Sequence, residues 1–316
     1  MRTRPRNWLR QRHKVLSRPT LKESLRIARK ELSNVAISEV DAELLAAFVL
    51  GVGRMDLHAK EFEFSPEQEV EFANLIEERK SGIPLQYLTG EANFRYLTFD
   101  VGPGVLIPRP ESELLVDAAL VEVERIQSAS SWRSGMRVSI VDLGAGTGAL
   151  AISIADESRK RNLAVQVVAV ENQPQALSWL ERNIAKHDVD VRVVKSDVAT
   201  ALEGIKCDLV IANPPYIPDG AELPKEVFAH EPATALFGGI AGIEVPTRFI
   251  ESATRILKPG GFLVLEHHES HSEPLAALLA PDYFDVAHFK DLNDRPRWLT
   301  ARLKNLEMIS SERNGE

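Results

Sequence analysis

The order of apolar and polar residues divides the chain into a helical part and a part in which strands and helices alternate. Between residues 20 and 81, apolar residues recur at the three- and four-residue spacing of amphipathic helices. Thr20 and Ser38 are placed to begin two of these helices. Ser65 begins a third, within a capping box that has proline at the first helical position. This stretch predicts a small bundle of short helices without strands.

Residues 82–113 break the helical pattern. Alternating aromatic and apolar runs surround the sequence GPG at 102–104, which predicts a β-hairpin that links two domains. The sequence IPRP at 107–110 then leads into a helix that is expected from about Glu111 to Ile126.

From Met136 onward, short apolar runs alternate with amphipathic helical segments. A chain that alternates in this way forms a parallel sheet with helices on its faces, so the predicted fold class is α/β. A Pro-Gly-Gly turn at 259–261 is expected to lead into the fifth strand. The predicted strands cover residues 138–143, 165–170, 191–194, 209–212, 262–265, 284–289 and 298–303.

Length and composition fit an ordinary two-domain protein. The chain has 316 residues, of which 44% are hydrophobic and 27% are charged. Its one cysteine, Cys207, lies on a predicted buried strand, where a small core residue is more common than a reactive thiol. A single cysteine excludes a disulfide within the chain, so a reducing compartment, the cytoplasm, is expected. No window approaches 18 uncharged apolar residues, so no membrane-spanning helix is predicted.

Charge is distributed unevenly along the chain. The net charge is −8, but residues 1–18 carry seven positive charges and no acid, which leaves −15 on the remaining residues. This acidic remainder argues against a protein that coats nucleic acid with its whole surface. The basic segment is compatible with contact to ribosomal RNA, with a transit peptide or with a solvated tail, and the tail is the interpretation that we favour.

The sequence CDLVIANPPYIP at 207–218 carries the first candidate for chemistry. Its apolar run predicts a buried strand that ends at Asn213, because the two prolines that follow have no N–H for the ladder. Ligands bind at the carboxyl edge of such sheets. The Asn213 side chain and the Pro214 carbonyl present two fixed acceptors beside the Tyr216 ring, an arrangement suited to a planar –NH2 group. The alternative is a proline-rich turn in which Tyr216 only packs.

An acid, a glycine loop and a second acid form a nucleotide-type pattern. The glycines allow a ligand to approach closely, and Glu171, at the end of the next predicted strand, can accept two ribose hydroxyls. Gly144, Gly146 and Ala149 also fit the dinucleotide fingerprint. Asp142 favours a different ligand, because a carboxylate before the loop repels a pyrophosphate and attracts a cation. S-adenosylmethionine is cationic and carries no phosphate, so the pattern favours this methyl donor over NAD.

Together these motifs resemble a known family. DLGAGTG, Glu171, the pair Ser196 and Asp197, and NPPY resemble class I S-adenosylmethionine-dependent methyltransferases that modify amide or amino nitrogens. With PLQYLTG, VLIPRPESELLV, HEPATALFGG and LKPGGFLVLE added, the chain resembles the peptide chain release factor glutamine methyltransferases, the PrmC or HemK family, from about Glu39 to Arg302. The resemblance implies a Rossmann-like sheet of seven mostly parallel strands with a late antiparallel strand, preceded by a small helical domain.

The expected domain organisation combines the pattern with the resemblance. A basic flexible arm at 1–19 precedes a helical domain at 20–90, which carries no donor motif and is expected to recognise the substrate. A β-hairpin linker at 91–110 joins it to the methyltransferase domain at 111–306, and a flexible tail follows at 307–316.

The resemblance also implies roles for individual residues. The methyl-donor contacts are expected to be Gly144, Ala145, Gly146, Thr147, Gly148, Glu171, Asp197, Val198 and Asn213, with Asp142 added from the charge argument. The glutamine-binding motif corresponds to Asn213, Pro214, Pro215 and Tyr216, of which Asn213, Pro214 and Tyr216 are expected to be catalytic. Three positions depart from the family: Glu171 stands where aspartate is common, Val198 where an aromatic ring often packs on adenine, and Ser112 where threonine is usual.

The activity that the resemblance implies is methylation of the N5 amide nitrogen of a glutamine in the GGQ loop of peptide chain release factors. S-adenosylmethionine is the expected donor, S-adenosylhomocysteine the product, and neither a membrane nor a nucleic-acid substrate is expected. The alternatives are a ribosomal-protein glutamine, adenine N6 in nucleic acid, or a non-catalytic ribosome-binding module. The acidic remainder of the chain disfavours the nucleic-acid enzyme, and the intact glycine loop with NPPY disfavours the non-catalytic module. The histidine-rich segment 266–271 matches no zinc motif, so no metal is predicted.

Overall fold

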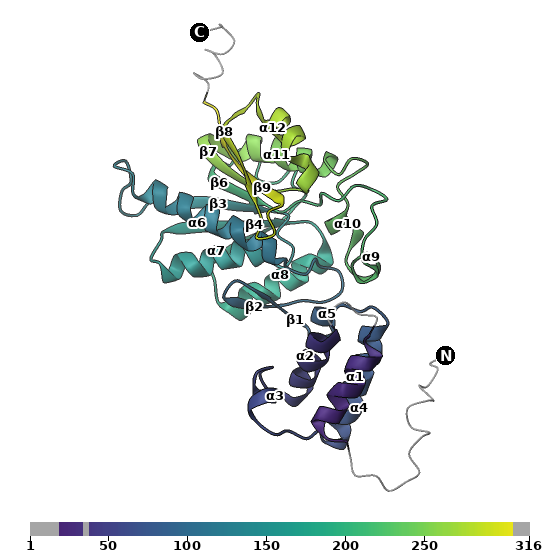
Figure 1. Ribbon diagram of the computed structural model, residues 1–316. Coiled ribbons are helices and arrows are strands. Elements are labelled where there is room, and N and C mark those ends of the chain that lie inside the picture. Colours follow the sequence, from purple (N-terminus) through teal and green to yellow (C-terminus); the bar gives the residue numbers. More distant parts are fainter. Residues whose placement is uncertain (1–18, 34–37, 306–316) are drawn as a thin grey trace. The chain divides into compact units, whose positions relative to one another are not determined.

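The computed structural model describes residues 19–33 and 38–305, which fall into two compact units that divide between Thr89 and Gly90 (Figure 1). The expected basic arm, apart from its last residue, and the expected tail at 307–316 lie outside the described residues. Within the described residues, no helix is long and apolar enough to cross a membrane.

The described residues of the first unit contain the three predicted helices and two shorter ones. They are α1 (Leu21–Glu31), α2 (Ser38–Leu50), α3 (Asp56–Ala59), α4 (Pro66–Lys80) and α5 (Leu85–Thr89). The Thr20 hydroxyl accepts the N–H of Glu23 and begins α1, while Ser65 and Gln68 form the predicted capping box at the start of α4. Apolar side chains of α1, α2 and α4 share one buried core.

A seven-stranded sheet forms the centre of the second unit. Its strands are β3 (Val138–Leu143), β4 (Val165–Glu171), β5 (Val191–Lys195), β6 (Cys207–Ala212), β7 (Leu257–Glu266), β8 (Tyr283–Lys290) and β9 (Pro296–Leu303). The spatial order is β5-β4-β3-β6-β7-β9-β8, and only β9 runs antiparallel to its neighbours. The expected mostly parallel sheet with a late antiparallel strand is confirmed. The predicted turn at 259–261 was wrong, because these residues form a bulge inside β7, where the register with β6 shifts.

Helices cover both faces of this sheet (Figure 1). The helices and helical turns of the second unit are η2 (Pro110–Ser112), α6 (Glu113–Gln127), α7 (Ala149–Lys160), α8 (Pro174–His187), α9 (Lys225–His230), α10 (Ala233–Leu236), α11 (Glu244–Ile256), η3 (Glu269–His271) and α12 (Ser272–Leu279). Helices α6, α7 and α8 lie on one face, and α11 and α12 lie on the other. The largest apolar core joins α11 and α12 to the sheet.

A β-hairpin opens the second unit, but its turn is not where the glycines predicted it. Strands β1 (Glu91–Phe94) and β2 (Leu97–Asp100) meet at Arg95, which takes a positive φ of 53°. The glycines at which the turn was predicted follow both strands instead. A Cβ on Gly102 would lie 2.5 Å from the ring of Trp179, so this position needs glycine for close packing rather than for a turn.

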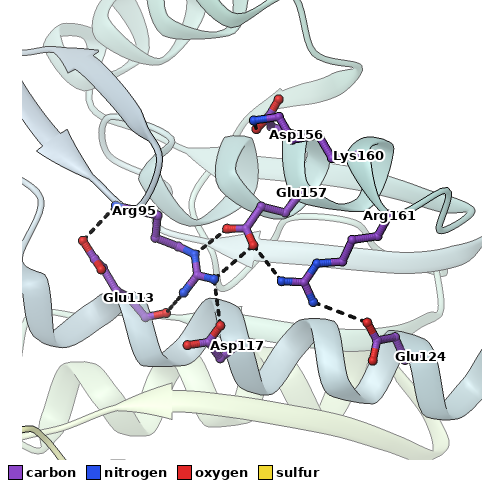
Figure 2. A network of polar contacts seen from close by, with 8 residues as sticks. All are labelled: Arg95, Glu113, Asp117, Glu124, Asp156, Glu157, Lys160 and Arg161. Atoms are coloured by element: carbon purple, nitrogen blue, oxygen red, sulfur yellow. Dashed lines mark hydrogen bonds and ion pairs between the residues drawn. The ribbon is translucent and has the colours of Figure 1, made fainter.

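Arg95 anchors the hairpin to two helices (Figure 2). Its backbone N–H donates to the Glu113 carboxylate at 2.8 Å, and its guanidinium pairs with Asp117 of α6 at 2.7 Å and with Glu157 of α7. Arg161 also pairs with Glu157, at 2.9 Å. A nearly buried arginine shared by acids from two helices fixes the hairpin firmly within the second unit.

The strand order places two loops side by side. Strand β3 lies between β4 and β6, so the connections that follow β3 and β6 leave the sheet in opposite directions. Leu143, the last residue of β3, is paired with Ala212, the last residue of β6. The glycine loop and the NPPY loop therefore begin next to each other at a topological switch point, where open α/β sheets bind ligands.

Candidate active site

A cavity of about 560 Å³ lies at this carboxyl edge of the sheet. The predicted site residues that line it are Gly144, Ala145, Gly146, Thr147, Glu171, Asp197, Val198, Asn213 and Pro215. Those that do not line it are Asp142, Gly148, Pro214 and Tyr216. The rest of the wall comes from Phe94, Ala149 and Leu150 and from residues within 104–112, 172–176, 232–235 and 245–249. All of these residues belong to the second unit.

Positive φ angles shape the glycine loop between β3 and α7. Gly146 has a φ of 56°, and the atom nearest to a Cβ there would be in Val105, at 3.9 Å, so the backbone faces open space. Gly148 has a φ of 84°, and a Cβ there would lie 2.6 Å from Leu180. The loop therefore packs tightly against the protein on one side and leaves its backbone accessible on the other.

Glu171 holds the glycine loop as well as facing the cavity. One carboxylate oxygen accepts the N–H of Gly146 at 2.9 Å, and the other accepts those of Asn172 and Gln173 at 2.8 Å each. A carboxylate has about four acceptor positions. Three are used here, so one position remains for a ligand hydroxyl.

Asp142 lies at the end of β3, fully buried and not on the cavity wall. One oxygen accepts the N–H of Ala151 in the first turn of α7 at 3.1 Å, and the other has no partner in the described part of the chain. Burial raises the pKa of Asp142 to about 7, the Ala151 bond acts to lower this pKa, and the charge of Glu171 acts to raise it. In this structure Asp142 supports the junction of loop and helix, and any effect on a ligand is electrostatic.

The charges around the cavity fit S-adenosylmethionine better than a dinucleotide. Among the described lining residues, the acids are Glu171 and Asp197, the cations are Arg109 and Arg248, and there is no lysine. Arg109 is paired with Glu231 at 2.6 Å. A pyrophosphate beside Glu171 would meet negative charge, whereas a cationic nucleoside would be attracted. The residues present therefore fit the methyl donor.

The amide of Asn213 is held by a residue from a distant segment. Its Nδ2 donates to the Ser112 hydroxyl oxygen at 2.9 Å. No hydrogen bond to the Asn213 Oδ1 or to the Pro214 carbonyl is found within 19–33 and 38–305. We call these two oxygens the acceptor pair. Asn213 lines the cavity, whereas Pro214 is buried and is not among the lining residues.

A buried carboxylate lies behind the acceptor pair. Glu266, the last residue of β7, accepts a hydrogen bond from the Ser112 hydroxyl with one oxygen and from the Tyr216 hydroxyl, at 2.9 Å, with the other. Burial is the main cause that raises the pKa of Tyr216, so this phenol stays protonated and donates. Sequence reasoning missed Glu266. The available signal was an acid that directly ends a buried strand at the ligand-binding edge.

The histidine-rich segment does not form a metal site in the described chain. His267 Nδ1 bonds to the backbone carbonyl of His268 at 2.7 Å, and His271 Nε2 bonds to that of Ala241 at 3.1 Å. Burial lowers the pKa of His267 to about 4. Among the described residues, no group of three or more histidine, cysteine, aspartate or glutamate side chains is arranged to hold a metal ion.

Two family models match the chain. The PrmC N-terminal domain matches residues 23–90, and the methyltransferase small domain matches residues 123–233. The first match coincides closely with the helical unit, and the second spans the glycine loop and the NPPY motif.

Proteins named release factor glutamine methyltransferase are similar over most of the chain. The one from Mycolicibacterium smegmatis is 40% identical over 274 residues, which cover 85% of this chain and 92% of that protein. The one from Streptomyces coelicolor is 36% identical over 276 residues, with 85% and 92% covered. The one from Salmonella typhimurium is 36% identical over 267 residues, with 83% and 91% covered. The likeness therefore extends through both units.

Proposed function

This chain belongs to the release factor glutamine methyltransferase family, and we propose that it transfers a methyl group from S-adenosylmethionine to the N5 amide nitrogen of the glutamine in the GGQ loop of peptide chain release factors. The observation that carries the proposal is the Asn213 amide, which lines a cavity suited to the methyl donor and is held through its Nδ2, so that Oδ1 is left as an acceptor. Two fixed acceptors match the two hydrogens of a primary amide.

The acceptor pair performs the positioning that this reaction needs. An amide nitrogen is a poor nucleophile, because its lone pair is delocalised into the carbonyl. When bound, S-adenosylmethionine supplies a methyl group on a sulfonium that is already strongly electrophilic. The chain therefore has to aim the nitrogen, and such positioning contributes about 7–11 kcal/mol in favourable systems.

Charge at the acceptor pair also stabilises the transition state. As the nitrogen attacks, positive charge grows on it, and in the proposed arrangement the oxygens of Asn213 and Pro214 oppose that charge. The amide loses one proton to water as the nitrogen–carbon bond forms. Tyr216 does not act as the base, since its raised pKa and its bond to Glu266 keep it a donor.

Three residues on one wall of the cavity would recognise the methyl donor, and we call this wall the donor side. The free acceptor position of Glu171 suits a ribose hydroxyl, and Asp197 adds a second acid on the same wall. Val198 packs against the main core from the cavity wall and offers an apolar surface to adenine. These roles account for a donor that is cationic and carries no phosphate.

We assign substrate recognition to the helical unit at 20–90. The cavity and all its lining residues belong to the other unit, so this unit is free to serve another purpose. A shortened chain that begins at Gly90 keeps the whole second unit. We expect it to bind the donor like the full chain but to methylate an intact release factor with kcat/KM lowered by at least about tenfold, the equivalent of 1.4 kcal/mol of lost recognition.

Two controls make this test specific. Thermal melting must show that the shortened chain folds, and a short GGQ peptide, which lacks the rest of the release factor, should be methylated equally by both chains. A shortened chain with full kcat/KM on the intact release factor contradicts the assignment.

The expected partner is a protein rather than nucleic acid, and the expected compartment is the cytoplasm. Residues beyond the first 18 carry a net charge of −15, which repels a phosphate backbone. Cys207 is a buried free thiol, which suits a reducing compartment.

Incubation with labelled S-adenosylmethionine tests the proposed function. Release factors, ribosomal proteins and DNA are offered in parallel, and labelled peptides are mapped by mass spectrometry. We expect label on the GGQ glutamine alone, and none on a release factor in which that glutamine is replaced by alanine. Label that persists on this control, or that appears only on ribosomal protein or DNA, contradicts the proposal.

A further inference from the structure

The mechanism proposed above gives no role to the buried carboxylate of Glu266, which lies behind the acceptor pair. Glu266 is 1% exposed, and an unpaired charge at that depth is costly. Its two oxygens are bonded by hydroxyls from two separate segments, Ser112 before α6 and Tyr216 after β6. Glu266 therefore connects the segment that holds Asn213 to the NPPY loop itself.

The direction of each hydrogen bond follows from this carboxylate. An ionised carboxylate only accepts, so the single hydrogen of the Ser112 hydroxyl is committed to Glu266. The Ser112 oxygen can then only accept from Asn213, which must turn Nδ2 toward it. The amide nitrogen and oxygen are almost equal in size, so shape alone does not fix this choice.

We infer that Glu266 is a positioning residue that sets the orientation of the Asn213 amide through Ser112 and so makes the site select a glutamine amide over a glutamate carboxylate. This inference rests on the proposed function. With Oδ1 toward the substrate, Asn213 accepts an N–H. A carboxylate offers no hydrogen and meets two oxygens, so it is rejected.

Protonation of Glu266 reverses the chain of hydrogen bonds. A neutral Glu266 can donate to Ser112 while it still accepts from Tyr216. The Ser112 hydrogen is then free to point at Asn213. The amide turns to receive it and presents its –NH2 to the cavity, which is the wrong group for a glutamine substrate.

The surroundings of Glu266 place this change near neutral pH. Burial raises the pKa of Glu266 to about 7. The groups that act to lower this pKa are Ser112, Tyr216 and Arg297 of β9, and Glu111 acts to raise it. Burial is the main cause that lowers the pKa values of the two neighbouring histidines, His267 and His268. Activity should therefore rise with pH through about 7, as Glu266 ionises.

Glu266→Gln tests the inference, because it keeps the size of the side chain and removes the charge. We expect kcat on the release factor to fall about 10- to 100-fold, the range typical when a partner that orients an active group is lost. Donor affinity measured by calorimetry should stay within about twofold, and the rise of kcat/KM near pH 7 should disappear. A GGE peptide, with glutamate in place of glutamine, should inhibit this variant more strongly than the wild type.

Variants of Ser112 supply the matched controls. Ser112→Thr keeps the hydroxyl and should retain most activity, whereas Ser112→Ala breaks the relay and should lose as much as Glu266→Gln. Because both changes break the same relay, the double variant should lose little more than either single variant. If Glu266→Gln does not fold in a thermal melt, the pH profile of Ser112→Ala decides alone, since it must also lack the rise near pH 7.

Three results would overturn the inference. They are full kcat in Glu266→Gln, independent and additive losses in the double variant, or a pH profile of Ser112→Ala that keeps the rise near pH 7. A wild-type protein that leaves the release factor unmodified in the same assay would instead refute the proposed function, so the two failures are distinguishable.

Discussion

The part of the cavity proposed to bind the methyl donor (the donor side) and the part proposed to bind the glutamine that accepts the methyl group (the acceptor side) are built in different ways. On the donor side, backbone N–H groups of a continuous glycine loop and of the turn after β4 bind one carboxylate, Glu171. On the acceptor side, Asn213, Ser112 and Glu266 form a chain of side-chain hydrogen bonds drawn from segments that are 101 and 154 residues apart. The donor side depends on local backbone shape, and the acceptor side depends on long-range packing.

This difference predicts how each side responds to change. A backbone cradle tolerates the loss of one side chain, because its N–H groups remain in place. A side-chain relay fails when any member is lost, since the remaining buried groups lose their partners. Substitutions on the acceptor side should therefore affect kcat, and those on the donor side should affect donor affinity.

The largest effect is expected at Asn213. Asn213→Ala removes one member of the acceptor pair and should lower kcat by about 10²–10³, the scale observed when one preorganised polar contact is deleted. Donor affinity should fall much less. Single-turnover rates on a release factor and calorimetry with S-adenosylmethionine measure the two quantities separately.

Asn213→Asp is the matched control for that prediction. It keeps the acceptor oxygens but loses the Nδ2 that donates to Ser112, and it adds a charge close to Glu266. We expect a loss of kcat between those of the wild type and Asn213→Ala. Near wild-type rates for Asn213→Ala would mean that NPPY is only a proline-rich turn.

The next effect is expected at Glu171. Glu171→Ala removes the proposed charge-assisted bond to the ribose, worth about 1.5–3 kcal/mol, and frees the loop N–H of Gly146. Donor affinity should fall by at least about tenfold. Glu171→Asp, which keeps the carboxylate, should bind the donor within a few-fold of the wild type. Unchanged donor affinity in Glu171→Ala, or tighter binding of NAD than of the donor, would contradict the cofactor assignment.

The two sides also differed in how far the sequence could predict them. The glycine loop and Glu171 follow consecutive strands, so their meeting is a property of the βαβ pattern. Glu266 was missed because its partners become neighbours only when β6 and β7 pair and the segment before α6 packs beside them. Ser112 was noted only as a departure from the family. Its contact with Asn213 depends on side-chain packing that no spacing encodes.

The fold shows the same limit in two glycine segments. The sheet, the approximate positions of its strands and the capping box followed from periodicity and local chemistry, although β7 begins at Leu257 and not at residue 262. The glycines at 102–104 and 259–261 were both interpreted as turns, yet one allows close packing against Trp179 and the other forms a bulge in β7. A glycine signals unusual backbone or close approach, and the tertiary structure decides which.

The smallest effect, and the one that sharpens the comparison most, is expected at Val198. This residue lies on the donor side, where the family often has an aromatic ring, and the backbone carbonyl of Val198 is held by Arg255 at 3.1 Å. Val198→Phe should let a ring stack on adenine and add about 0.5–1.5 kcal/mol, which tightens donor binding about 2- to 10-fold. The catalytic rate at saturating donor should not change, because the acceptor side is untouched.

Val198→Ile is the control that separates stacking from size. It adds apolar volume without a ring, so it should leave donor affinity close to that of the wild type. Calorimetry on the wild type, Val198→Phe and Val198→Ile measures donor affinity. An equal increase in affinity in both variants would mean that added side-chain volume, not ring stacking, causes the effect. Weaker donor binding by Val198→Phe would show that adenine does not lie against this wall. The proposed donor site would then depend on Glu171 and not on Val198.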